Sequence, residues 1–207
     1  MKVKVFLLTW ELWRKYAWGR AYQVSLKGRP KHYRYRSSLT YGETPRPVMK
    51  KIRRWSQIGS EDLFLELGSG TGHFSLWLSL ISQCQSIGIE FVPQFVESAN
   101  FIAKKHSINA QFLVADLFEY PWGSADLIYL TATCFKEEQM EEVAKKCEEL
   151  KSGARLVVLT YSLDVKSLEL CEMWVEDFSW GSSTLFLYKK IDVEISSEEI
   201  ESIDSEK

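Results

Sequence analysis

Short apolar runs alternate with segments of helical spacing from about residue 41 onward. Runs of five to seven largely apolar residues bounded by turn residues are typical of buried strands, whereas apolar positions three or four apart indicate helices. The pattern predicts strands at 62–67, 86–90, 110–115, 125–130 and 155–161, and helices at 47–55, 72–82, 93–106 and 136–151. This alternation is typical of an α/β sheet with parallel strands and crossover helices.

The C-terminal part follows a different pattern. Residues 173–180 and 182–190 surround Gly181 and predict a hairpin, which would close one edge of the sheet and bring it to seven strands. Residues 191–207 are acidic and contain no aromatic residue, so we expect disorder beyond Ile195. The predicted organisation is therefore an arm at 1–40, a domain at 41–190 and a tail at 191–207.

The N-terminal arm is apolar first and then basic. Residues 3–13 are mostly apolar, but Glu11 interrupts them and the run is shorter than the ~18 residues of a membrane-spanning helix. We therefore expect a peripheral or packed amphipathic segment. Residues 14–36 mix lysine and arginine with tyrosine and tryptophan, a composition that suits a phosphate-rich polymer, an anionic lipid surface or an acidic protein. An arm whose aromatic residues pack on the domain is equally consistent with it.

Charge is divided sharply along the chain. The 207 residues are 45% hydrophobic, enough for one domain with a substantial core. The formal net charge of −2 is the sum of two opposed parts. Residues 1–54 hold 15 basic and 2 acidic residues, whereas residues 55–207 hold 11 basic and 26 acidic residues. Residues 14–54 are therefore the expected contact for an anionic partner, either nucleic acid or an acidic membrane surface.

Cysteine spacing argues against a metal centre. The four cysteines form no Cys-x-x-Cys pair, so neither a zinc site nor a disulfide framework is expected. Cys134 has no histidine nearby in the sequence, and we interpret it as a small buried apolar residue rather than a nucleophile.

The strongest chemical signal is the run Glu66-Leu-Gly-Ser-Gly-Thr-Gly72 between a predicted strand and helix. Glycines at these positions let the backbone turn sharply and approach a ligand, although tight packing alone also uses glycine. Glu90 ends the next strand, where a carboxylate can accept hydrogen bonds from ribose hydroxyls, and Asp116 follows the third strand, where it can accept from an adenine amine.

Glu66 narrows the choice of nucleotide. The chain lacks the Gly-x-x-x-x-Gly-Lys-Ser/Thr pattern of triphosphate-binding loops. A dinucleotide would place its pyrophosphate at this turn, where the Glu66 carboxylate would repel it. Glu66 suits a ligand with a cationic amino-acid tail instead.

These motifs resemble those of class I S-adenosylmethionine-dependent methyltransferases, through ELGSGTG at 66–72, GIE at 88–90 and AD at 115–116. The resemblance covers about residues 40–165. It implies a Rossmann-like fold with a seven-stranded mixed sheet, and S-adenosyl-L-methionine as cofactor. It also implies that the cofactor is held by Glu66, Gly68, Ser69, Gly70, Thr71, Gly72, Glu90, Asp116 and Leu117.

A narrower resemblance precedes the glycine turn. Tyr41-Gly42-Glu43-Thr44, followed by DLFLELGSGTG at 62–72, is similar to the segment before the glycine loop of the disruptor-of-telomeric-silencing family, the histone-lysine methyltransferases without a SET domain. That resemblance implies that Tyr41, Gly42, Glu43 and Thr44 close over the cofactor. The alternative is an ordinary turn in which Gly42 and Pro45 lead into the helix at 47–55.

The acceptor side departs from that family, which has paired asparagines after the fourth strand. This chain has Thr131-Ala132-Thr133-Cys134-Phe135 there, and it lacks the Asn/Asp-Pro-Pro-Tyr signature of enzymes that methylate amides or base amines. We expect Tyr41, Thr131 and Phe135 to shape the catalytic side, with Thr133 as an alternative hydroxyl. The expected function is methylation of a lysine on a protein substrate, in the cytoplasm or at the periphery of a membrane. There are two alternatives. The chain could be a small-molecule or lipid methyltransferase at a membrane surface, or a non-catalytic protein of the same fold that binds nucleic acid.

Overall fold

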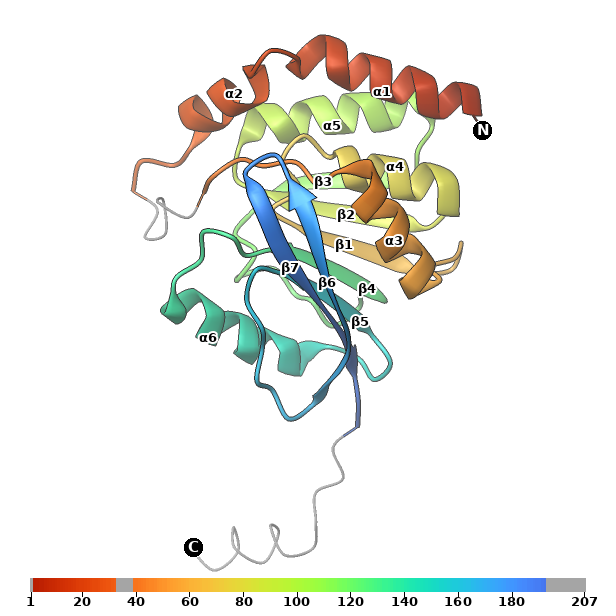
Figure 1. The fold of residues 1–207 in the computed structure, drawn as a ribbon. Helices are drawn as coiled ribbons and strands as arrows, with labels where there is room; N and C mark the ends of the chain where they lie inside the picture. The colour runs from red at the N-terminus through yellow and green to blue at the C-terminus, as the bar shows by residue number, and fades with distance from the viewer. Residues whose placement is uncertain (1, 33–38, 193–207) are drawn as a thin grey trace, which may run out of the picture.

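The central element is one mixed sheet of seven strands (Figure 1). The structure, a computed structural model, describes residues 2–32 and 39–192. The strand order is β3-β2-β1-β4-β5-β7-β6; β1 to β5 run parallel and β7 runs antiparallel to both of its neighbours. The strands are β1 (Leu63–Leu67), β2 (Gln85–Glu90), β3 (Ala110–Val114), β4 (Leu127–Thr131), β5 (Arg155–Leu159), β6 (Leu168–Phe178) and β7 (Gly181–Lys190). The predicted seven-stranded α/β sheet with a closing hairpin is confirmed.

Helices cover both faces of the sheet (Figure 1). One face carries α3 (Arg46–Ser56), α4 (His73–Ser82) and α5 (Pro93–His106), and α6 (Glu137–Lys146) covers the other. Each face buries its own apolar core, because successive residues of a strand point to opposite sides. Phe64 and Tyr129 belong to the first core, whereas Leu65 and Leu130 belong to the second.

Two predicted boundaries are wrong. The helix predicted at 136–151 ends at Lys146 and gives way to a short 3₁₀ helix, η2 (Cys147–Glu149). The Cys147 carbonyl accepts a 3₁₀-type bond from the Leu150 N–H at 3.3 Å, and it also accepts from the Lys190 ammonium at 3.0 Å. Strand β6 begins at Leu168 rather than at 173, because its pairing with β7 continues across a bulge between Leu170 and Glu172.

Two helices occupy most of the described N-terminal arm. They are α1 (Lys2–Tyr16) and α2 (Arg20–Gly28), which lie over α5 (Figure 1). Helix α1 buries Leu8, Leu12 and Tyr16 in the core shared with α4 and α5. Within the ranges 2–32 and 39–192, no helix is both long and apolar enough to cross a membrane. The predicted disorder of the tail beyond Ile195 lies outside the described residues.

An ion-paired carboxylate fixes α1 on the domain. Glu11 accepts hydrogen bonds from Lys105 at 2.9 Å and His106 at 2.7 Å, both at the end of α5. Burial alone would raise the pKa of Glu11. The hydrogen bonds and charges of Lys105 and His106 outweigh this effect, so the pKa is lowered. The glutamate that interrupts the apolar N-terminal run therefore serves as an attachment point.

Candidate functional site

The turn between β1 and α4 depends on glycine. Gly68, Gly70 and Gly72 have φ angles of 80°, 52° and 75°, in the left-handed region that favours glycine. The N–H groups of Gly68 and Ser69 both donate to the Ile89 carbonyl at 2.9 Å, which ties the turn to the end of β2. The turn therefore lies at the carboxyl edge of the parallel strands, where open α/β sheets bind ligands.

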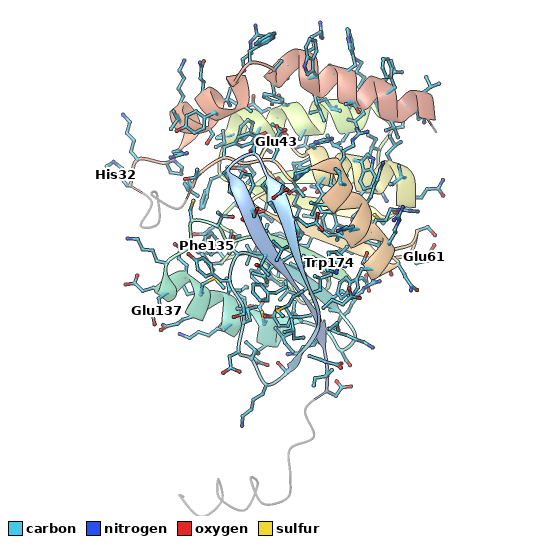
Figure 2. The ribbon with its side chains drawn as sticks, in the orientation of Figure 1. His32, Glu43, Glu61, Phe135, Glu137 and Trp174 are labelled. Atoms are coloured by element: carbon cyan, nitrogen blue, oxygen red, sulfur yellow. The ribbon has the colours of Figure 1, made fainter. Side chains whose placement is uncertain are left out.

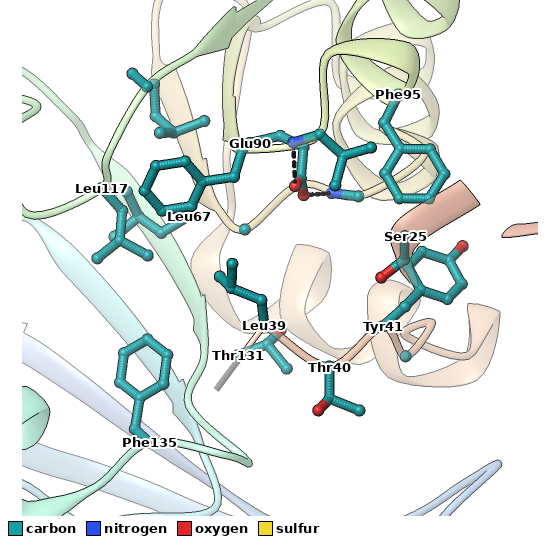
Figure 3. Close-up of a pocket in the computed structure, with 17 residues that line it drawn as sticks. Ser25, Leu39, Thr40, Tyr41, Leu67, Glu90, Phe95, Leu117, Thr131 and Phe135 are labelled. Carbon is teal, nitrogen blue, oxygen red and sulfur yellow. Dashed lines mark hydrogen bonds between the residues drawn. The ribbon is translucent and has the colours of Figure 1, made fainter. Parts of the chain in front are cut away.

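Glu90 extends this attachment with its side chain. Its Oε2 atom accepts from the Gly70 N–H at 2.7 Å, and its Oε1 atom accepts from the Val92 N–H at 2.9 Å (Figure 3). Burial raises the pKa of this carboxyl, and the backbone N–H groups oppose that shift by stabilising the ionised form. Glu90 thus faces the glycine turn from the end of the neighbouring strand.

Glu66 is the more deeply buried of the two carboxyls, with 6% of its surface exposed. Its Oε2 atom accepts from the backbone N–H of Ser75 at 3.0 Å and from the Ser75 hydroxyl at 2.5 Å. Burial raises the pKa of Glu66 to about 8, and the neighbouring charge of Glu90 adds to the rise. A cation that entered beside Glu66 would favour its ionised form.

The segment Tyr41–Thr44 covers the glycine turn. The Tyr41 ring lies so close to Gly70 that a Cβ there would approach it to 3.0 Å, and it packs on Phe95 at a centroid distance of 5.3 Å. The Tyr41 hydroxyl donates to Glu43. Thr44 shares a hydrogen bond of 2.8 Å with the buried Tyr129 hydroxyl. The segment therefore lies over the glycine turn, and it is called the lid below.

A tryptophan that the sequence analysis missed supports this lid. Gly42 lies against the Trp180 ring at the tip of the β6–β7 hairpin, and a Cβ at Gly42 would overlap that ring. Trp180 stacks in turn on Phe178, with centroids 4.8 Å apart. Gly42 and Trp180 are far apart in the sequence, and no local pattern signals their contact.

Residues from the lid, α2 and four strand ends surround one cavity (Figure 3). It is lined by Ser25, Leu39, Thr40, Tyr41, Gly42, Leu67, Gly68, Gly70, Ile89, Glu90, Phe91, Val92, Phe95, Ala115, Leu117, Thr131 and Phe135. Its volume of about 100 Å³ is below the roughly 300 Å³ at which ligand pockets usually begin. A nucleoside-sized ligand would therefore extend beyond this cavity.

A smaller hollow continues from this cavity beneath the lid. It is lined by Tyr41, Gly42, Glu43, Thr44, Met49, Glu66, Gly68, Ser69, Gly70, Thr71, His73, Phe74 and Thr131. His73 is the first residue of α4, directly after the glycine turn. Burial and the nearby Arg46 lower its pKa to about 4, and its Nε2 atom is buried without a hydrogen-bond partner among the described residues. A neutral imidazole here can exchange a hydrogen bond with an entering ligand.

Two predicted positions differ in how they relate to the cavity. Asp116 does not line the cavity, although its neighbours Ala115 and Leu117 do. Its Oδ1 atom accepts from the Phe118 N–H at 3.0 Å and so stabilises the turn after β3. Thr131 rather than Thr133 faces the cavity, because Thr133 accepts a hydrogen bond of 3.1 Å from Thr160.

The three residues that the sequence assigned to the catalytic side all border this cavity. Tyr41, Thr131 and Phe135 all line the cavity, and Phe118 lies 6.0 Å from Phe135 between ring centroids. Cys134 is half-buried and is not part of the lining. Among the described residues, no group of three or more histidine, cysteine, aspartate or glutamate side chains could hold a metal ion.

Comparison with known proteins places this geometry in a family. A family model described as a methyltransferase domain matches residues 58–203, which is more than half of the chain. The chain belongs to the methyltransferase-domain family. Its fold is that of class I methyltransferases. An RNA methyltransferase from Salinibacter ruber, crystallised with S-adenosyl-L-homocysteine, superposes with a TM-score of 0.60 at 22% identity, over 75% of this chain and 97% of that one.

Other members of this fold act on different acceptors. Magnesium protoporphyrin IX methyltransferase from Synechocystis, with bound S-adenosylmethionine, has a TM-score of 0.60 at 12% identity and covers 88% of this chain and 96% of that one. A Caenorhabditis elegans histone-lysine N-methyltransferase specific for H3 lysine-79 is 28% identical over 61% of this chain. A Shewanella woodyi methyltransferase of 23S rRNA uracil is 34% identical over 43%. This methyltransferase-domain chain spans 15% and 21% of the lengths of these two curated relatives.

We predict that Gly42→Ala strains the lid through the Trp180 ring. Overpacking costs about 1–3 kcal/mol, and the cost should fall below about 1 kcal/mol when Trp180 is first replaced by alanine. Urea unfolding of the four proteins in this double-mutant cycle measures the coupling. Gly59→Ala is the matched control, because a Cβ at Gly59 meets nothing within 4 Å. Equal costs of Gly42→Ala in both backgrounds would contradict the contact.

We also predict a specific pH dependence for Glu66. Its pKa rises from 4.5 to about 8 on folding, so the folded chain keeps a proton that the unfolded chain loses. The contribution of Glu66 to stability is therefore fully present below pH 4.5 and is lost as pH rises through about 8, by at most ~1.4 kcal/mol per pH unit.

The free energy of unfolding, measured from pH 5 to 9 for the wild type and Glu66→Gln, isolates this contribution. The advantage of the wild type over Glu66→Gln should shrink as pH rises. Glu97→Gln, at an exposed position of α5, is the matched control. A pH-independent difference for Glu66→Gln would refute the raised pKa.

Proposed function

We propose that this chain is an S-adenosylmethionine-dependent methyltransferase that acts on the amine of a protein lysine. The observation that carries the proposal is the arrangement of Glu66 and Glu90 on either side of a glycine turn beneath the Tyr41–Thr44 lid. Family membership and the class I fold support the transferase activity. The lysine acceptor rests on the lid and on residues around the cavity.

The residues present fit this cofactor. Glu90 can accept hydrogen bonds from ribose hydroxyls, and Gly68 and Gly70 leave room for close approach of the ligand. Glu66 offers a buried carboxyl to a cationic amino-acid tail, while Ala115 and Leu117 provide an apolar border for a purine. The Ser69 hydroxyl is buried without a partner among the described residues. When bound, S-adenosylmethionine supplies an electrophilic methyl group on a sulfonium.

Three features support an amine acceptor. Glu43 is exposed and lines both the hollow beneath the lid and an outer cleft of about 570 Å³, so its carboxylate can attract and orient a lysine ammonium. The apolar wall of Phe135 and Phe118 disfavours the charged form of an amine and so helps it to lose its proton. Orienting two reactants can contribute about 7–11 kcal/mol, so no dedicated base is required.

The relatives include both protein and RNA methyltransferases. Besides the histone-lysine enzyme, a ribosomal protein L11 methyltransferase from Ralstonia pickettii is 21% identical over 58% of this chain, which spans 40% of its length. The sequence lacks the Asn/Asp-Pro-Pro-Tyr signature associated with base amines and amides. This absence favours the protein acceptor over an exocyclic base amine.

A labelling experiment tests the acceptor. The chain is incubated with cofactor carrying a labelled methyl group in fractionated cell extract, and labelled species are identified by mass spectrometry. Methylated lysine in a protein is the expected result. Label in RNA or in a small molecule would overturn the lysine acceptor but keep the transferase activity. Cofactor binding without transfer to any fraction would overturn the activity itself.

Replacing Glu90 tests cofactor binding directly. Glu90→Gln keeps the size of the side chain but removes the charge that strengthens its hydrogen bonds to ribose, a loss of about 1.5–3 kcal/mol, or roughly tenfold to a hundredfold in affinity. Isothermal titration calorimetry with S-adenosylmethionine measures the change. Glu97→Gln on the exposed side of α5 is the matched control. Unchanged affinity in Glu90→Gln would remove Glu90 from the site.

A further inference from the structure

Helix α1 carries two apolar faces, and the domain covers one of them. Leu8, Leu12 and Tyr16 are buried against α4 and α5. The opposite side, here called the outer face of α1, consists of Val3, Phe6, Leu7, Trp10 and Trp13, each between 42% and 70% exposed. Side chains stand away from the domain along this helix in Figure 2.

The outer face is continuous because of its spacing. Its residues recur at intervals of three and four, which places them on one side of an α-helix. Trp18 extends it into the turn before α2; it is 89% exposed and has a φ of 62°, a backbone conformation unusual for a bulky residue. Soluble surfaces rarely expose contiguous apolar side chains without a partner.

Positive charge accompanies this apolar face. Lys4, Arg14, Lys15, Arg20 and Lys27 are all exposed on α1, α2 and their connection. The Arg14 guanidinium lies 5.3 Å from the centre of the Trp10 ring. Within residues 1–32 the sequence holds one acidic residue, Glu11, and its carboxylate pairs with Lys105 and His106 of α5. Helices α1 and α2 therefore add no unpaired carboxylate of their own that would repel an anionic partner.

We propose that the outer face of α1 binds the surface of a lipid bilayer containing anionic headgroups, with the helix lying in the plane of the interface. Such helices bury aromatic and aliphatic side chains among the lipids while cations contact the headgroups. Tryptophan favours this boundary because its ring is apolar and its N–H is polar. This inference goes beyond the proposed function and does not depend on it.

The aliphatic residues distinguish a bilayer from nucleic acid. Aromatic rings and cations could stack on bases and neutralise phosphates. Val3 and Leu7, however, gain free energy only by leaving water for an apolar environment, which a bilayer provides and a polyphosphate backbone does not. A bilayer therefore satisfies the apolar and the cationic residues together.

The outer face also adjoins the candidate site. Trp13 lines a cavity of about 220 Å³ together with Glu43, Thr71 and His73, which belong to the lid, the glycine turn and the start of α4. Binding through α1 would therefore hold the lid side of the domain near the lipid surface. A substrate that is itself at the membrane would meet the site without a long diffusional search.

Sedimentation with vesicles tests the inference. The full chain is mixed with phosphatidylcholine vesicles that contain or lack phosphatidylserine, at low and high salt. We expect binding to the anionic vesicles that weakens with salt. The variant Phe6→Ser/Trp10→Ser/Trp13→Ser should lower the partition coefficient at least about tenfold, because it removes most of the buried apolar area. Quenching of tryptophan fluorescence by brominated lipid should fall in parallel.

Matched variants distinguish vesicle binding through the outer face of α1 from nonspecific adsorption of exposed apolar side chains. Met173→Ser/Val175→Ser removes apolar side chains on β6 that are 60% and 72% exposed, and its vesicle binding should equal that of the wild type. Arg14→Glu/Lys15→Glu should weaken binding to anionic vesicles alone. Thermal unfolding checks that each variant remains folded, as expected from the exposure of the replaced residues. The proposal would be overturned if the wild type did not bind vesicles, or if the triple variant bound them as well as the wild type does. Displacement from vesicles by duplex RNA or DNA at equal charge would also overturn it.

Discussion

The attachment of the glycine turn to the end of β2 is the constraint on which the site depends. Three backbone N–H groups, those of Gly68, Ser69 and Gly70, are bound by the Ile89 carbonyl and the Glu90 carboxylate. Strand β1 lies between β2 and β4, so the strand order changes direction at β1. Such a point leaves a crevice at the carboxyl ends of the strands, and residues that follow β4 also border it. Glu66, Glu90 and Thr131 lie on the paired strands β1, β2 and β4, so the sheet holds all three beside this turn.

The lid is held by weaker and more scattered contacts than the turn. Tyr41 packs on Gly70 and Phe95, Thr44 bonds to Tyr129, and Gly42 packs on Trp180. A neutral hydrogen bond contributes about 0.5–1.5 kcal/mol net, so these contacts can break without disturbing the sheet. The glycine turn is fixed by the backbone of the sheet, whereas the lid above it is fixed by side chains. The floor of the site is therefore more rigid than its cover.

Local patterns predicted the parts of this site that depend on short stretches of sequence. The spacing of apolar runs identified the strands, and Glu90 could be placed because it ends a strand adjacent to the glycine turn. Trp180 could not be placed, since its contact with Gly42 arises only after the hairpin pairs with β5. The adenine contact of Asp116 stays a prediction, because a carboxylate after a strand can bond to a ligand or to its own backbone turn, and the Oδ1 atom of Asp116 bonds to that turn.

The same limit applies to α1, whose sequence is apolar on two sides. Periodicity shows that a helix has two apolar faces but not which one the domain covers. Glu11 decides this, because its partners Lys105 and His106 lie at the end of α5 and turn the Leu8 side inward. The aromatic outer face and the basic residues beside it are then directed to solvent together.

The basic N-terminal residues and the acidic residues of the candidate site therefore act over different distances. Exposed cations on α1 and α2 act over a Debye length of about 8–10 Å and are weakened by salt. Glu66 and Glu90 are enclosed and act on a ligand only after it has entered beneath the lid, where salt screens them little. The proposed binding to an anionic surface and the proposed binding of a cationic ligand should therefore respond differently to ionic strength.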